Sequence, residues 1–186
     1  MDIFKLTAES AAHSRQHALV WLIDHCIPFA DLFWLVEVGV YTGETAEALL
    51  AWLPMMCYVG IDTWLPRGED PLCGGKIWAY QRARQVIAPY YPRARLIARN
   101  SVDAARDFAP GTMDLVFIDA GHDHEAVTAD LAAWQAIVKP GGVLCGHDYR
   151  YIPEVGQAVD EFFGQAPEYI GGEADVWWVV KEGRGC

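Results

Sequence analysis

The sequence has no apolar run long enough to cross a membrane, because Asp, Glu, Pro or Gly interrupts its longest hydrophobic stretches. Its first ten residues lack the basic start and apolar block of a signal peptide. Positive charge is also scarce: 14 basic side chains against 25 acidic ones give a formal net charge of −11, which repels polyanions. We therefore expect a cytoplasmic protein that partners neither membranes nor nucleic acids.

The cysteines lack the spacing of a disulfide or metal-binding motif. The five cysteines include no C-x-x-C pair and their number is odd, which favours reduced structural thiols. Five arginines between Arg82 and Arg99 are the exception to the acidic balance. They could face an anionic substrate, although a solvated helix and strand edge explains them as well.

What the chain does have is apolar content, 53% of 186 residues, which is enough for one core without disulfides or metal. We expect a single domain over residues 1–186, with a leading helical segment at 1–30. The eight tryptophans leave a homodimer open.

Short apolar blocks alternate with helical patterns along most of the chain, which predicts a parallel α/β sheet. The last two blocks flank a glycine turn and predict a terminal hairpin. The expected fold is thus a Rossmann-like three-layer sandwich, with a mainly parallel seven-stranded sheet and an antiparallel C-terminal strand. The expected strands are Phe33–Val38, Cys57–Ile61, Arg95–Ala98, Leu115–Ile118, Val143–Cys145, Glu168–Ile170 and Val176–Val180.

Helical spacing predicts a leading helix around Thr7–Cys26, and a helix from about Glu125 to Val138 that stops at Lys139-Pro140-Gly141-Gly142. The turn-rich stretch Thr63–Lys76 interrupts the alternation of strands and helices. Loops at that position overhang the ligand site of open α/β sheets. We expect it to be a lid or substrate wall, with a merely mobile insertion as the alternative.

The stretch most informative about function is Glu37-Val-Gly39-Val-Tyr41-Thr-Gly43-Glu-Thr45, at the end of an apolar strand. A strand, glycine turn and helix in this order aim backbone N–H groups and a positive helix end at a ligand. Dinucleotide sites use G-x-G-x-x-G, whereas these glycines are three residues apart and follow an acid. The spacing therefore favours S-adenosylmethionine over NAD.

Polar residues follow the next two strands. Asp62 can accept hydrogen bonds from both ribose hydroxyls of a nucleoside. Asn100 and Ser101 are placed to meet an adenine edge, although Ser101 could equally cap the helix that follows.

Later strand ends carry groups suited to metal binding or proton transfer. Asp119 ends one strand and His122 follows after a glycine, while His147 and Asp148 end the next strand. Two carboxylates and an imidazole, from Asp119, His147 and Asp148, form a donor set open to Mg²⁺, Mn²⁺ or a later transition metal. His122-Asp-His124 also matches the start of a binuclear zinc hydrolase site, but a helix follows where further ligands would be needed.

Together these motifs resemble the class I S-adenosylmethionine-dependent methyltransferases, over about Phe33–Lys181. The first motif is similar to that of the catechol-type, metal-dependent O-methyltransferases. The segments around Asp119-Ala-Gly-His122 and His147-Asp148 are similar to small methyltransferases of macrolide-sugar and cephamycin pathways. His147 departs from the pattern, because the adjacent pair in those enzymes is usually two acids or an acid and an amide.

The resemblance implies roles for individual residues. The methionine end of S-adenosylmethionine would lie on Glu37, Gly39, Tyr41, Gly43 and Thr45, its ribose on Asp62, and its adenine on Asn100 and Ser101. Asp119 would face the cofactor and join His147 and Asp148 at a divalent metal, with His122 as catalytic base.

The implied reaction is O-methylation of a small-molecule acceptor, a sugar or an aromatic diol, with aromatic acceptor walls expected at Tyr149–Pro153. The alternatives are an NAD-dependent Rossmann oxidoreductase, a metal-dependent hydrolase, and a cofactor-binding protein without transferase activity.

Overall fold

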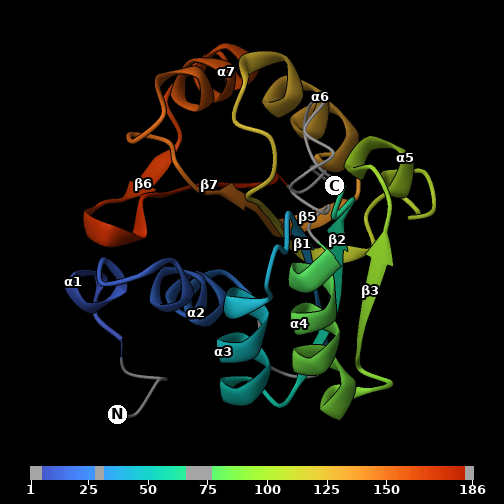
Figure 1. Ribbon diagram of the computed structural model, residues 1–186. Helices are drawn as coiled ribbons and strands as arrows, with labels where there is room; N and C mark the ends of the chain where they lie inside the picture. The colour runs from blue at the N-terminus through green and yellow to red at the C-terminus, as the bar shows by residue number, and fades with distance from the viewer. Residues whose placement is uncertain (1–5, 28–31, 66–76, 183–186) are drawn as a thin grey trace.

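The computed structural model of the protein describes residues 6–27, 32–65 and 77–182. This part of the chain forms a seven-stranded sheet in the order β3-β2-β1-β4-β5-β7-β6 (Figure 1). The five strands from β3 to β5 are parallel, whereas β7 runs antiparallel to both β5 and β6. The strands are β1 (Phe33–Val38), β2 (Met56–Asp62), β3 (Ala94–Ala98), β4 (Met113–Ile118), β5 (Val138–Gly146), β6 (Glu168–Ile170) and β7 (Val176–Val180).

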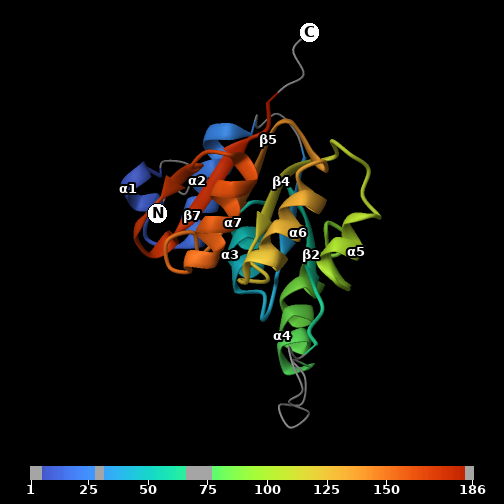
Figure 2. The same cartoon turned by 90° about the horizontal axis from the view of Figure 1, so that it is seen from above.

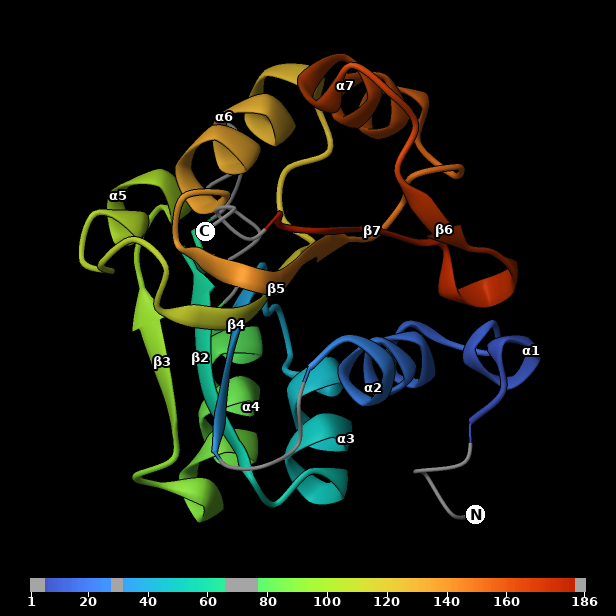
Figure 3. The same cartoon turned by 180° about the vertical axis from the view of Figure 1, so that it is seen from behind.

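Helices cover both faces of the sheet. Figures 1 and 3 show α2, α3 and α4 on one face and α5, α6 and α7 on the other. The expected three-layer, Rossmann-like sandwich with an antiparallel C-terminal strand is therefore confirmed. The helices are α1 (Ala8–Ala11), α2 (Arg15–Cys26), α3 (Glu44–Trp52), α4 (Ile77–Ile87), α5 (Ser101–Ala105), α6 (His124–Trp134) and α7 (Pro153–Phe163), with short 3₁₀ turns η3 (Ala88–Tyr90) and η4 (Gly172–Ala174).

The central strands are apolar on both sides because both sides are covered. Successive side chains of a strand point to opposite faces. Accordingly Leu35 of β1 packs in the core under α2 and α3, while Val36 packs in the core under α5, α6 and α7. Both side chains are completely buried. Continuous burial of this kind is typical of parallel sheets.

Two helix predictions need correction. The leading helix is not continuous: α1 ends before a break, and Ser14 starts α2 by accepting a hydrogen bond from the His17 N–H. The predicted helix Glu125–Val138 ends at Trp134, and the expected stop at residues 139–142 lies inside β5. Pairing decides this, because Val138 pairs with Met113 and the chain at 141–142 bonds to Lys181.

The C-terminal hairpin of β6 and β7 lies beside α1 and α2 (Figures 1 and 2). The Ala174 N–H donates to the carbonyl of Ala12 at 3.2 Å. The hairpin thereby connects the N-terminal helices to the sheet edge. No helix in the described ranges is both long and apolar enough to cross a membrane.

Candidate active site

A cavity of about 560 Å³ opens at the carboxyl ends of β1, β2 and β4, where open α/β sheets bind their ligands. Of the predicted lid, Thr63 and Leu65 line this cavity, and residues 66–76 lie outside the described ranges. Most of the predicted site residues also line it: Glu37, Gly39, Tyr41, Thr45, Asp62, Asn100, Ser101, Asp119 and His122. Gly43, His147, Asp148 and the expected acceptor wall Tyr149–Pro153 do not.

The turn after β1 requires glycine for steric reasons. Gly39 has φ +96°, and a Cβ added there would lie 2.0 Å from the carbonyl oxygen of Asp119. Its N–H donates to the Ile61 carbonyl at 2.8 Å, so the turn sits between β2 and β4. Gly43, at φ +83°, precedes α3, and its Cβ position faces Ala83 of α4 at 3.4 Å. Gly39 therefore lets the turn approach β4, while Gly43 lets two helices pack.

Glu37 is a buried acid in the cavity wall. Its carboxylate accepts a hydrogen bond from the Tyr58 hydroxyl, and only 2% of the residue is exposed. Burial raises the pKa of Glu37 to about 8, against the lowering effect of the Tyr58 hydrogen bond. Glu37 can thus hold a proton near neutral pH unless a cation compensates its charge.

Asp62 holds the glycine turn as well as facing the cavity. Its carboxylate accepts from the N–H groups of Val40 at 3.2 Å, Tyr41 at 2.9 Å and Trp64 at 2.8 Å. A carboxylate has about four acceptor positions, so capacity for a further donor remains. The predicted ribose ligand is therefore also the residue that ties the ends of β1 and β2 together.

Asn100 and Ser101, which follow β3, differ from the expectation in which of them caps the next helix. Asn100, not Ser101, caps α5, because its side chain accepts from the N–H groups of Val102 and Asp103. The Ser101 hydroxyl donates instead to Asp130 of α6, which is 3% exposed and lines the cavity. The sequence reasoning missed Asp130. Its place within the apolar stripe of α6 was the available signal, since an acid on a buried helix face needs a partner.

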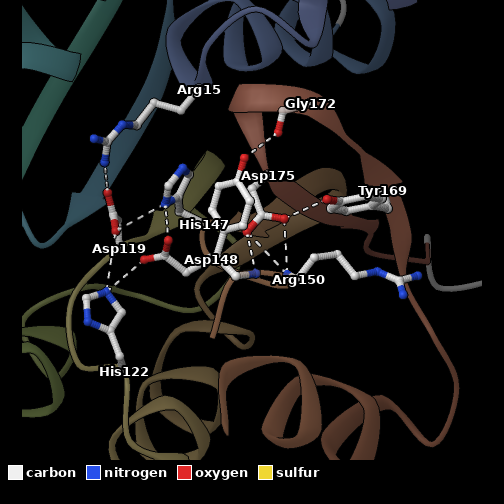
Figure 4. Close-up of polar contacts among 10 residues, drawn as sticks. Arg15, Asp119, His122, His147, Asp148, Arg150, Tyr169, Gly172 and Asp175 are labelled. Carbon is white, nitrogen blue, oxygen red and sulfur yellow. Dashed lines mark hydrogen bonds and ion pairs between the residues drawn. The ribbon is translucent and has the colours of Figure 1, made fainter. Parts of the chain in front are cut away.

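Four titratable side chains meet where β4 and β5 end, because the two strands are neighbours and Ile118 pairs with Gly146. His122 Nε2 lies 3.0 Å from one oxygen of Asp148, and His147 Nδ1 lies 2.9 Å from the other (Figure 4). Each of these nitrogens is also 3.9 Å from Asp119 Oδ1. The structure therefore brings together all of the residues predicted for metal binding and proton transfer.

The donor set of this cluster fits a divalent cation. One ligand atom each from Asp119, His122 and Asp148 lies within 4.8 Å of the others. His122 Nε2 and His147 Nδ1 are buried atoms that contact Asp148 as ion pairs but without hydrogen-bond geometry. Two imidazole nitrogens that converge on two carboxylates match the donor set of a metal site. His122 joins the predicted metal set on this geometry.

Mutual electrostatics hold the cluster in a charged form. The carboxylates of Asp119 and Asp148 raise the pKa of His122 to about 9. Burial raises the pKa of Asp148, but His122 and His147 together bring it well below its usual range. In this arrangement His122 keeps its proton at neutral pH. Action as a base therefore requires a change that weakens its contact with the two carboxylates.

Arg15, the first residue of α2, is a second residue that the sequence reasoning missed. Its guanidinium pairs with Asp119 Oδ2 and lines the cavity (Figure 4). Since 104 positions separate the two partners, no local motif could reveal the pair.

Asp175 fixes the backbone that follows Asp148. This fully buried carboxylate accepts from the N–H groups of Arg150 and Tyr151, at 3.1 and 3.0 Å, and from the Tyr169 hydroxyl at 2.6 Å. Asp148 itself has φ +60°, a conformation that is uncommon outside glycine. Figure 4 shows that Asp175 reaches this turn from the C-terminal hairpin. Tyr149, an expected acceptor wall, is buried and donates instead to Asp160.

Known proteins share the fold at low identity. A candidate caffeoyl-CoA O-methyltransferase from Staphylococcus aureus superposes with a TM-score of 0.68 at 14% identity, covering 89% of this chain and 82% of that one. The TDP-rhamnose 3′-O-methyltransferase of calicheamicin biosynthesis gives 0.62 at 17% identity, with 89% and 77% covered. The O-methyltransferase NovP gives 0.58 at 21% identity, with 90% and 77% covered.

Sequence comparison identifies one curated relative, an uncharacterised protein of Acanthamoeba polyphaga mimivirus, which is 26% identical over 144 residues. The match takes in 72% of this chain but spans only 62% of the length of that relative. A family profile described as a methyltransferase domain matches residues 36–149, which is more than half of the chain and includes the glycine turn, Asp119 and Asp148. The chain therefore belongs to the methyltransferase domain family, as its resemblance to class I methyltransferases predicted.

Proposed function

We propose that the protein transfers the methyl group of S-adenosylmethionine to a hydroxyl oxygen of a small molecule, on a sugar or an aromatic diol. One observation carries the proposal: the glycine turn, Asp62 and the Asp119–His122 pair all line a single cavity of about 560 Å³. A cofactor on the turn would therefore have its sulfonium end near residues that can take up the proton of the acceptor hydroxyl. Pockets of this size suit a small organic ligand.

The cofactor would lie along the ends of β1, β2 and β3. Its ammonium group would meet the buried Glu37, its ribose Asp62, and its adenine the wall formed by Asn100 and Ser101. Glu37 has a reason to bind a cation, since burial outweighs the Tyr58 hydrogen bond and the charge of Arg15 and keeps its pKa near 8. This contact favours a sulfonium cofactor with a free amino group over NAD.

The reaction needs chiefly a well-placed, deprotonated nucleophile, because the sulfonium methyl is already activated. Holding the two reacting atoms in near-attack geometry is worth roughly 7–11 kcal/mol. Asp119, His122, His147 and Asp148 would hold a divalent ion, which when bound supplies a positive charge that stabilises the ionised hydroxyl. Arg15 and Leu65 line the same cavity and would bound the acceptor.

The cofactor assignment is tested by thermal shift. S-adenosylhomocysteine should raise the melting temperature, by mass action on the native state, whereas NAD should not. A shift with NAD alone would favour the oxidoreductase alternative. Methyl transfer is then measured over a panel of sugar nucleotides and catechols, and cofactor binding without transfer to any acceptor would support a binding-only protein.

The metal assignment is tested with Asp148→Ala. This change should abolish turnover that depends on Mg²⁺ or Mn²⁺ while leaving S-adenosylhomocysteine affinity within about twofold, because Asp148 does not line the cofactor cavity. Glu154→Ala, an exposed acid in the first turn of α7, is the matched control. Full activity of the wild-type protein in excess chelator would contradict metal assistance.

A further inference from the structure

Arg15 places a cation at the proposed metal cluster. It starts α2, where the Ser14 side chain accepts from the His17 N–H and sets the direction of the first helical turn. Its guanidinium contacts Asp119 Oδ2, with 34% of the Arg15 side chain exposed and only 12% of the Asp119 side chain. Arginine keeps its charge at every accessible pH, so this positive charge is permanent.

The two oxygens of Asp119 face different partners. Oδ2 pairs with Arg15, and Oδ1 lies 3.9 Å from both His122 Nε2 and His147 Nδ1. A divalent ion bound through Asp119 would therefore share a carboxylate with a guanidinium. Like charges a few ångströms apart in a half-buried setting repel strongly. The guanidinium and the ion thus oppose each other at this residue.

Arg15 compensates the charge of Asp119. The ion pair joins one guanidinium to one carboxylate, and the Asp119 side chain is only 12% exposed. Removal of Arg15 would leave this carboxylate without its arginine partner. The cost of an uncompensated carboxylate favours cation uptake.

We infer that the Arg15 guanidinium competes with a divalent metal ion for Asp119, so that Arg15 sets how tightly the cluster of Asp119, His122, His147 and Asp148 binds metal. The inference rests on the metal-assisted form of the proposed function. Metal binding therefore also affects α2, because a bound ion weakens the contact between α2 and the end of β4.

The test is Mn²⁺ binding by isothermal titration calorimetry, in full-length protein without cofactor or acceptor. Arg15→Gln should bind Mn²⁺ at least about tenfold more tightly than the wild type, because a competing charge is lost. Arg15→Lys keeps the charge and should stay within about threefold of the wild type. Arg99→Gln is the matched control: Arg99 lines the same cavity but pairs with Asp107, and it should change the affinity by less than about twofold.

Several outcomes would overturn the inference. Equal or weaker Mn²⁺ binding by Arg15→Gln would show that the guanidinium does not compete, as would no detectable binding by that variant. Equal tightening in Arg15→Lys and Arg15→Gln would assign the effect to relaxed structure instead of charge. Circular dichroism of each variant reports whether the fold is kept. None of these results depends on methyl transfer, so a failure of the proposed reaction would be seen separately.

Discussion

Replacement of Asp175 should destabilise the protein far more than its position in a short hairpin suggests. In Asp175→Ala, the N–H groups of Arg150 and Tyr151 and the Tyr169 hydroxyl all lose their acceptor. Each orphaned donor costs about 1–3 kcal/mol, and the lower end applies because Arg150 and Tyr151 are exposed residues that water can reach. Three donors then cost about 3 kcal/mol.

The backbone adds a second contribution. Asp175 has φ +42°, and a left-handed conformation costs alanine roughly 1–2 kcal/mol, whereas Asp and Asn tolerate it. The total for Asp175→Ala is about 4–5 kcal/mol, and Asp175→Asn should lose about half of that. In a protein of this size 1 kcal/mol corresponds to roughly 2–4 °C of melting temperature, so the alanine variant should melt about 8–20 °C lower.

Urea unfolding followed by tryptophan fluorescence gives the free energy of unfolding for each variant. Tyr151→Phe is the matched control, because it removes a single exposed hydrogen bond from the same turn, to the Gly172 carbonyl at 3.0 Å. It should cost less than about 1 kcal/mol. Mn²⁺ binding should weaken in Asp175→Ala as well, since Asp148 precedes the turn that Asp175 holds. If Asp175→Ala were no less stable than Tyr151→Phe, the carboxylate would not be the anchor of this turn.

Two further predictions concern the cavity wall. Gly39→Ala places a Cβ 2.0 Å from the Asp119 carbonyl oxygen at φ +96°, and it should abolish the thermal shift with S-adenosylhomocysteine. The control is Gly141→Ala, at φ +79° with nothing within 4 Å of the added Cβ. It should keep the thermal shift and lower the free energy of unfolding by only about 1 kcal/mol or somewhat more. Glu37 has a folded pKa of about 8 against an ordinary value of 4.5, so the native state binds the extra proton, and the stability of the wild type relative to Glu37→Gln should fall as pH rises from about 4.5 to about 8. Urea midpoints of both proteins over that range measure the difference, and a constant difference would mean that Glu37 ionises normally.

Local pattern was enough to predict the sheet and the cofactor side of the site. Strands buried on both faces read as continuous apolar blocks, so Phe33–Val38 and Val176–Val180 were predicted with the observed bounds. The glycine turn and Asp62 were recognisable because a strand end, a turn and a helix start are neighbours in sequence. Predictions failed where distant pairing overrides local preference: Lys139-Pro140-Gly141-Gly142 favours a turn, yet β4 and β7 draw it into β5.

What the sequence alone determined is therefore the order of the elements and the chemistry at each strand end, because both depend on residues close together along the chain. Only the tertiary structure decided which charged side chains contact which partners. The pairing of β4 with β5 brings His122 to Asp148, the packing of α2 brings Arg15 to Asp119, and the hairpin brings Asp175 under residues 150 and 151. These contacts join segments far apart in the chain, and their energies depend on burial and distance, which a linear pattern does not encode.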